Sequence, residues 1–266
     1  MMQRGVKEFV LTTEAMQMDC IAFGSGSKPL VMIQGLNTNG IRGAGVSLAW
    51  MYRMFAKDHR VYLFDRRKNL PDHVTVRELA EDTARAMDAL GLKNADVLGV
   101  SLGGMMAQYL AIDRPDLVGK LVLAVTTCKS GEAVQQTIRW WTELTLRKDW
   151  RGLTADMAER MYSEAYLKRY RPFLPLLTLL QKPRNVPRFL TLCKACLTCD
   201  TAAELHKITC PVLVIGGGLD RVVGNNAAAQ LAQTLQCASH IYETLGHAAY
   251  EEAEDFDRRV YDFFGQ

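Results

Sequence analysis

The sequence lacks the features that mark exported, membrane-spanning and nucleic-acid-binding proteins. Residues 1–10 contain neither the unbroken apolar stretch nor the small-residue cleavage site of a secretory signal. The longest nearly uncharged run, residues 97–112, is short for a membrane span and contains glycines, a serine and a glutamine. The 32 basic and 29 acidic residues are spread along the chain and give no electrostatic footprint for nucleic acid or anionic lipid. We therefore expect a small-molecule partner, no nucleic-acid partner and no integral membrane association.

The cysteines also give no sign of a disulfide framework, because seven is an odd number. Together with the missing export signal, this count favours reduced thiols and a cytoplasmic location. Cys193, Cys196 and Cys199 have a spacing found in some metal sites, but Cys210 is badly placed as a fourth ligand. Because the three recur at about one helical turn among leucines, we interpret them as packing residues and expect neither a metal nor a cofactor.

The sequence does contain a regular alternation of apolar runs and helical segments. Five short, almost continuous apolar runs are typical of strands buried on both faces of a parallel sheet: residues 30–34, 61–65, 97–100, 121–125 and 212–215. Longer segments with helical spacing separate them, such as residues 76–90 with one apolar face. The alternation predicts right-handed βαβ crossovers and an α/β fold, in which helices flank a mostly parallel sheet.

Both ends of the chain add further elements to this sheet. Residues 9–12 and 16–23 have strand-like composition and are separated by a short polar connection, which predicts an antiparallel hairpin at one edge. Near the other end, residues 240–243 predict a strand, and residues 250–264 have the spacing of a closing helix. The predicted sheet is therefore mixed.

The alternation stops in the middle of the chain, where several helical segments are broken by prolines. We predict a core formed by residues 1–128 and 207–266, with residues 129–206 inserted as a helical cap. Within the cap, residues 173–180 are rich in leucine. This cluster is compatible with a homodimer interface or with a lid that faces lipid, as well as with internal packing.

The segment Gly99-Val100-Ser101-Leu102-Gly103 lies between a predicted strand and a predicted helix. This is the context of the G-x-S-x-G nucleophile elbow, which holds a serine in a sparsely populated backbone conformation and exposes its hydroxyl. A strand that runs into a helix also favours glycines for packing alone, so the assignment depends on partners elsewhere in the chain. For a nucleophile here, the Leu102 N-H at the positive end of the helix is a donor to an oxyanion.

The partners of such a serine follow it in the order acid and then histidine. Asp220 and His247 each follow a predicted late strand, and so would lie at the same edge of the sheet as Ser101. His247 would take the hydroxyl proton as general base, while Asp220 orients the imidazole. Taken singly, Asp220 is equally a turn residue and His247 an ordinary loop histidine. Asp200, the nearest competing acid, falls in the helical cap.

Residues 99–108, 113–118 and 210–215 resemble the α/β-hydrolase superfamily, and the elbow looks like that of its enol-lactonase and non-haem haloperoxidase-like branch. The resemblance spans nearly the whole chain and is weakest in the cap. It implies the α/β-hydrolase fold and a second oxyanion donor, the N-H of Leu36, because the family places His-Gly directly before that position. Here Gln34 replaces the histidine, which changes the side chain available to support the loop.

These features predict a serine hydrolase that cleaves a small carboxylic ester, lactone or thioester through an acyl-enzyme. The same triad also serves C–C bond hydrolases and lyases, and a ligand receptor or regulatory protein can use the fold without turnover. Gln34, Trp140, Trp141 and Tyr166 are candidate substrate-binding residues, since the cap lies over the elbow in related folds and its rings can line an acyl pocket. Packing between cap and core is the alternative for the aromatic rings.

Overall fold

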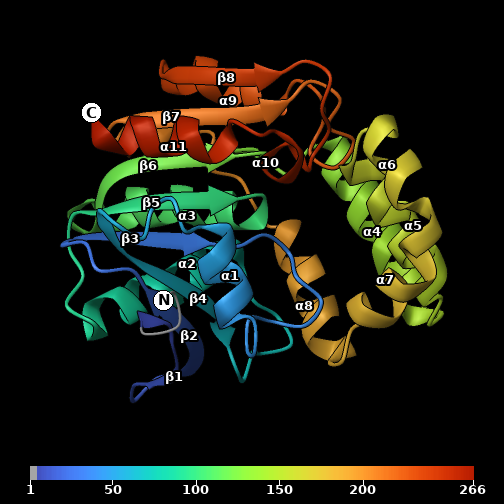
Figure 1. The fold of residues 1–266 in the computed structure, drawn as a ribbon, viewed down its shortest axis with the longest axis horizontal. Helices are drawn as coiled ribbons and strands as arrows, with labels where there is room; N and C mark the ends of the chain where they lie inside the picture. Colours follow the sequence, from blue (N-terminus) through green and yellow to red (C-terminus); the bar gives the residue numbers. More distant parts are fainter. Residues whose placement is uncertain (1–4) are drawn as a thin grey trace.

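The computed structural model describes residues 5–266, so the first four residues of the N-terminal segment considered above lie outside it. Eight strands form one sheet in the order β1-β2-β4-β3-β5-β6-β7-β8 (Figure 1). Their bounds are β1 Lys7–Thr12, β2 Gln17–Phe23, β3 Lys28–Ile33, β4 His59–Arg67, β5 Ala95–Val100, β6 Val118–Ala124, β7 Val212–Gly217 and β8 Ala238–Tyr242. β2 pairs antiparallel with both β1 and β4, and the strands from β4 to β8 pair in parallel. The predicted edge hairpin and mostly parallel sheet are confirmed.

Helices cover both faces of this sheet (Figure 1). One face carries α2 Val76–Ala89, α3 Leu102–Asp113 and α9 Ala227–Leu235, and the other carries α1 Gly45–Met51, α10 Ala249–Glu252 and α11 Phe256–Gly265. The predicted helix at residues 76–90 begins with a capping box, in which Thr75 Oγ1 accepts from the Glu78 N-H and the Glu78 carboxylate accepts from the Thr75 N-H. A separate apolar cluster fills the space on each side of the sheet.

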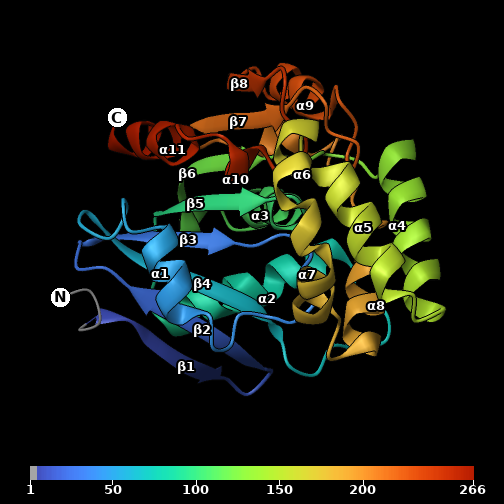
Figure 2. The ribbon, with the colours of Figure 1, turned by 45° about the vertical axis from the view of Figure 1, so that its right-hand side comes forward.

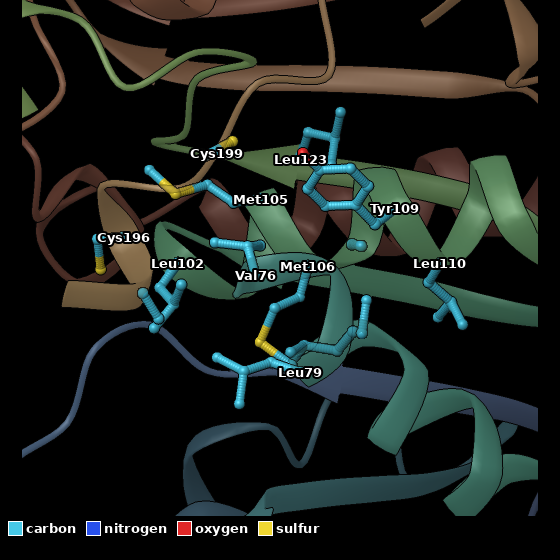
Figure 3. Packing of buried hydrophobic residues seen from close by; sticks show 14 of the residues in the cluster. Val76, Leu79, Leu102, Met105, Met106, Tyr109, Leu110, Leu123, Cys196 and Cys199 are labelled. Atoms are coloured by element: carbon cyan, nitrogen blue, oxygen red, sulfur yellow. The ribbon is translucent and has the colours of Figure 1, made fainter. Parts of the chain in front are cut away.

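The helix after the elbow is buried around its whole circumference. Every residue from 102 to 112 is buried, because α3 packs against β5, β6 and α2. Figure 3 shows Leu102 and Met106 of this helix with Val76 and Leu79 of α2. A helix held on all sides fixes the turn from which it starts.

The predicted cap region contains α4 Glu132–Leu146, α5 Trp150–Met161, α6 Glu164–Tyr170, α7 Leu174–Gln181 and α8 Val186–Cys196. These helices lie at the edge of the sheet toward which the arrowheads of β3, β5 and β7 point (Figure 2). The chain enters and leaves the region side by side, since Lys129 and Asp200 form an isolated antiparallel bridge. The boundaries of the core and the cap as separate domains stay a prediction. No helix between residues 5 and 266 has the length and apolarity needed to cross a bilayer.

The C-terminal helix predicted at residues 250–264 is interrupted in the structure. α10 ends at Glu252, Ala253 takes an extended conformation, and α11 begins at Phe256. The Tyr242 hydroxyl donates to the Asp255 carboxylate at 2.7 Å, which fixes the turn between the two helices to β8. Periodicity alone does not reveal this break, because the apolar spacing continues across it.

Candidate active site

Ser101 lies at the turn between β5 and α3, at the edge of the sheet that faces the cap (Figure 2). Its φ of 54° and ψ of −119° form a combination that non-glycine residues rarely adopt. The Ser101 N-H donates to the Ala124 carbonyl at 2.9 Å, and the Thr126 hydroxyl donates to the Ser101 carbonyl at 2.8 Å. The strained turn expected from the G-x-S-x-G motif is therefore present and held from β6.

This turn needs glycine because neighbouring backbone passes very close to it. A Cβ atom on Gly103 would lie 1.9 Å from the carbonyl oxygen of Ile33, and one on Gly99 would lie 2.6 Å from the carbonyl oxygen of Gly103. Neither obstacle is the end of a flexible side chain, so a larger residue would push backbone segments apart. The two glycines allow β3, β5 and α3 to meet beside Ser101.

His247 and Asp220 reach the serine from the ends of two adjacent strands, β8 and β7. The distance from His247 Nε2 to Ser101 Oγ is 2.9 Å, and the distance from His247 Nδ1 to Asp220 Oδ2 is 2.7 Å. The second oxygen of Asp220 accepts from the N-H groups of Val222 and Val223 at 2.8 and 3.0 Å. Asp220 and His247 are only 4% and 3% exposed, so these bonds hold both groups away from competing water.

The two predicted oxyanion donors lie on backbone that adjoins Ser101. Leu102 is the first residue of α3, and the first amides of a helix have no carbonyl partner within it. A Cβ atom on Gly35 would lie 3.2 Å from Ser101 Cβ, so the loop that carries Leu36 passes directly beside the serine. The arrangement suits two N-H groups that converge on a developing negative charge.

Arg66, which no sequence motif singles out, supports this loop. It is 3% exposed at the end of β4, and its Nη2 donates to the carbonyls of Gln34 and Gly35 at 2.5 and 3.2 Å. Burial lowers the pKa of Arg66 to about 10. The Gln34 side chain accepts from Asn37 within the same loop at 3.4 Å. Gln34 and Arg66 thus both stabilise the loop. From the sequence, an arginine beside Asp65 at a strand end ordinarily indicates a surface residue.

A cavity of about 370 Å³ lies between the loop after β3 and helices α5, α6 and α7, a size typical of small-molecule sites. Apolar side chains make up much of its lining, including Leu36, Met157, Met161, Leu167 and Leu177. Leu36 connects the cavity to the elbow, since its neighbour Gly35 adjoins Ser101. Ser101 and His247 are not part of the described lining, so the cavity lies beside the elbow at the loop that carries Leu36.

Tyr166 is the one candidate substrate-binding residue that lines this cavity. Its ring stacks between those of Tyr162 and Tyr170, with centroid distances of 4.7 and 4.3 Å. A spacing of four residues is typical of one helix face, but Tyr162 ends α5 and Ser163 caps α6, so the stack crosses a break between two helices. The aromatic wall is therefore a product of how α5 meets α6.

The structure does not bring the two candidate tryptophans to the described lining of the cavity. Trp141 is 4% exposed and its indole N-H donates to Asp156 at 2.8 Å, which ties α4 to α5. Trp140 is on the other side of α4 and 38% exposed. Adjacent positions on a helix point about 100° apart, so the pair cannot face one cavity together. The contacts of Trp141 agree with a packing role rather than a substrate-binding role.

Other groups of chemical interest have structural roles away from Ser101. His59 bonds to Asp96 at 3.0 Å near the start of β4, at the opposite end of the strands from Ser101. Cys193, Cys196 and Cys199 are buried, and desolvation raises the pKa of each thiol, that of Cys196 to about 12. Since the thiolate is the form that binds metal, their burial agrees with a packing role.

Comparison with known proteins adds relatives that span most of the chain. It is 24% identical over 220 residues to 3-oxoadipate enol-lactonase 2 of Acinetobacter baylyi, covering 80% of this chain and 79% of the relative. It is 29% identical over 278 residues to a 2-hydroxy-6-oxononadienedioate/2-hydroxy-6-oxononatrienedioate hydrolase of Dechloromonas aromatica, covering 97% of this chain and 93% of that protein.

Solved structures show the same fold. The enol-lactonase from Burkholderia xenovorans superposes with a TM-score of 0.83 at 19% identity, covering 97% of this chain and 100% of that one. An alpha/beta hydrolase enzyme from a Medee basin deep-sea metagenome library superposes with a TM-score of 0.87 at 20% identity, covering 97% and 98%. The family model described as "Alpha/beta hydrolase family" matches residues 30–259. The chain therefore belongs to the alpha/beta hydrolase family and has its fold.

Proposed function

We propose that the protein is a serine hydrolase that transfers the acyl group of a small carboxylic ester, lactone or thioester to water. Ser101 Oγ attacks the carbonyl carbon while His247 Nε2 takes the hydroxyl proton, and the oxyanion accepts from the N-H groups of Leu36 and Leu102. The tetrahedral intermediate expels the alkoxide or thiolate, which receives the proton from His247 and leaves an acyl-enzyme. Water that gives its proton to His247 then attacks the acyl-enzyme and releases the acid.

The observation that carries this proposal is the unbroken contact from Ser101 Oγ through His247 to Asp220, at 2.9 and 2.7 Å. The hydroxyl is within the distance needed for proton transfer to the imidazole. Asp220 supplies the negative charge that stabilises the imidazolium formed by that transfer. The names of the relatives, an enol-lactonase among them, support hydrolysis at an acyl carbon.

The cavity favours a neutral acyl group. Its described lining contains the carboxylate of Glu251 and no lysine or arginine. A substrate carboxylate would lose water there without gaining a cation, and burial of an unpaired charge is costly. This argues against the dicarboxylates in the names of the C–C bond hydrolase relatives, and favours a monocarboxylic ester, lactone or thioester.

We also propose that the protein works in a reducing compartment, which the sequence predicts to be the cytoplasm. All seven cysteines are free thiols in the structure. Disulfides are rare where glutathione and thioredoxin keep thiols reduced, so the free thiols support this location.

Labelling with a fluorophosphonate probe, read by intact mass, tests the proposed nucleophile and base. The native protein should gain one probe adduct, because only an activated serine reacts quickly. Ser101→Ala and His247→Ala should not be labelled, whereas Ser239→Ala, which removes an exposed hydroxyl on β8, should react like the native protein. Absence of labelling in folded native protein would contradict the proposal and favour the ligand-receptor alternative.

A further inference from the structure

The outer side of the cap exposes an unusual number of large apolar side chains. Four of them lie in or beside α7: Phe173, Leu176, Leu179 and Leu180, which are 55, 56, 73 and 62% exposed. On a neighbouring face of the same helix, Leu177 and Gln181 line the cavity. α7 thus presents a cluster of large apolar side chains to the solvent, which is typical of a surface that meets another apolar phase.

The charges around these side chains are mostly basic, with Glu164, which pairs with Lys168 at 3.3 Å, as an acid just before them. The balanced charge of the whole chain conceals a stretch, residues 165–199, without aspartate or glutamate. This stretch has seven basic residues: Lys168, Arg169, Arg171, Lys182, Arg184, Arg188 and Lys194. Arg188 is bound internally to Asp65 at 2.6 Å, but five others lie exposed just before and after α7. The four apolar side chains are therefore bordered by cations at both ends of the helix.

The helix is held so that these side chains stay outward. Asn39 donates to the Leu180 carbonyl at 3.2 Å and accepts from the Arg184 N-H at 2.9 Å, which ties the end of α7 to the loop after β3. α7 also packs on α5 beneath it. In Figure 2 no helix or strand covers the front of α7. The exposed face is thus part of the fixed arrangement of the cap.

We propose that this surface, Phe173, Leu176, Leu179 and Leu180 with the flanking cations, docks onto an anionic lipid–water interface. α7 would lie in the plane of the interface, with its exposed side chains in the acyl boundary and the lysines and arginines among anionic headgroups. Each basic residue close to an anionic leaflet strengthens binding by about fivefold. The helix has eight residues and does not span the bilayer, so this is peripheral association.

A second copy of the chain is a poorer occupant of the same surface. In a symmetric dimer the same patch meets itself, so the cations at both ends of α7 would face identical cations without acidic partners in residues 165–199. Like charges brought together in this way oppose association. An anionic lipid interface offers charged headgroups to the cations and acyl chains to the apolar side chains.

Co-sedimentation of the full chain with vesicles tests the proposal independently of any enzymatic activity. We compare vesicles of phosphatidylcholine alone with vesicles of equal parts phosphatidylcholine and phosphatidylglycerol. The native protein should bind the anionic vesicles, and binding should weaken at high salt because the charges are exposed. The double variant Lys182→Gln/Arg184→Gln should lower the partition coefficient by about 10- to 30-fold. Leu176→Gln/Leu180→Gln should lower it by about tenfold or more.

Two matched controls replace exposed residues far from the cap. Lys93→Gln precedes β5 at the opposite end of the strands, and Val10→Gln lies on the edge strand β1, where 45% of the side chain is exposed. Both should bind anionic vesicles like the native protein. Circular dichroism checks that every variant is folded.

The proposal is overturned if the native protein does not bind anionic vesicles, or if both α7 variants bind as well as the native protein. It is also overturned if the native protein forms a dimer in analytical ultracentrifugation that Leu176→Gln/Leu180→Gln abolishes, because the surface is then an interface between copies.

Discussion

At the scale of single residues, Glu251 is the charged group that most directly affects what the cavity accepts. It lines the cavity and accepts a hydrogen bond from the Tyr162 hydroxyl at 2.5 Å. Burial, together with the nearby negative charge, raises the pKa of Tyr162, so this phenol stays a neutral donor. The pair therefore gives the lining of the cavity a negative charge that repels an anionic substrate.

Changing Glu251 to glutamine should relax this discrimination. The native enzyme should hydrolyse p-nitrophenyl butyrate with a kcat/KM about tenfold or more above that for mono-p-nitrophenyl succinate, which carries a carboxylate on an acyl chain of the same length. Glu251→Gln keeps the shape of the side chain and an acceptor for Tyr162. It should lower the ratio of the two kcat/KM values, because the repulsion of the succinate carboxylate is removed. Glu254→Gln, which alters an exposed acid outside the described lining, should leave it unchanged. Equal ratios in the native enzyme and Glu251→Gln would contradict the role of this charge.

At the scale of elements, the elbow depends on three segments that touch at glycine. At Gly103, α3 passes very close to β3, since a Cβ atom there would lie 1.9 Å from the Ile33 carbonyl oxygen. The strained backbone of Ser101 persists because the surrounding elements cannot move apart without losing their packing.

Gly103→Ala should therefore destabilise the whole core. We expect a loss of about 3 kcal/mol or more in the free energy of unfolding, since the methyl group forces backbone to shift. Urea denaturation measures this change. Gly265→Ala is the control, because a Cβ there meets nothing within 4 Å and alanine favours a helix. If Gly103→Ala were as stable as the native protein, α3 and β3 would not pass as close to each other as the structure shows.

At the scale of the whole molecule, α11 carries a partly buried carboxylate, that of Asp257, near Arg53. Desolvation raises the pKa of Asp257 to about 6, and Arg53 offsets only part of the effect. In the unfolded chain an aspartate binds a proton only below about pH 4. Between these values the folded protein holds a proton that the unfolded chain does not. Stability from this group is therefore present at low pH and is lost as pH rises through about 6.

Asp257→Asn should remove this dependence. The variant should unfold at a higher urea concentration than the native protein above about pH 6, and at the same concentration below about pH 4. Asp262 is exposed on the same helix, so Asp262→Asn should leave the urea concentration of unfolding unchanged at both pH values. If Asp257→Asn raised the urea concentration of unfolding equally at both pH values, the charge of Asp257 would not be the cause of the increase.

The sequence by itself determined the local chemistry of this protein. The glycines around Ser101 are dictated by the turn, and Asp220 and His247 follow strands whose ends meet at one edge, so pattern and chain order were enough to bring the three together. The order of hydrophobic runs likewise determined the mostly parallel sheet, because strands buried on both faces have to be apolar throughout.

Only the tertiary structure decided which side of each element meets which neighbour. Arg66 supports the loop of Gln34 and Gly35 from a strand more than thirty positions away, as the separations of 32 and 31 residues show. The turn of Trp141 toward Asp156, the tyrosine stack across a helix break and the outward leucines of α7 have the same origin. Periodicity shows that a helix has an apolar face, but the packing of distant segments determines whether that face is covered, lines a cavity or stays exposed.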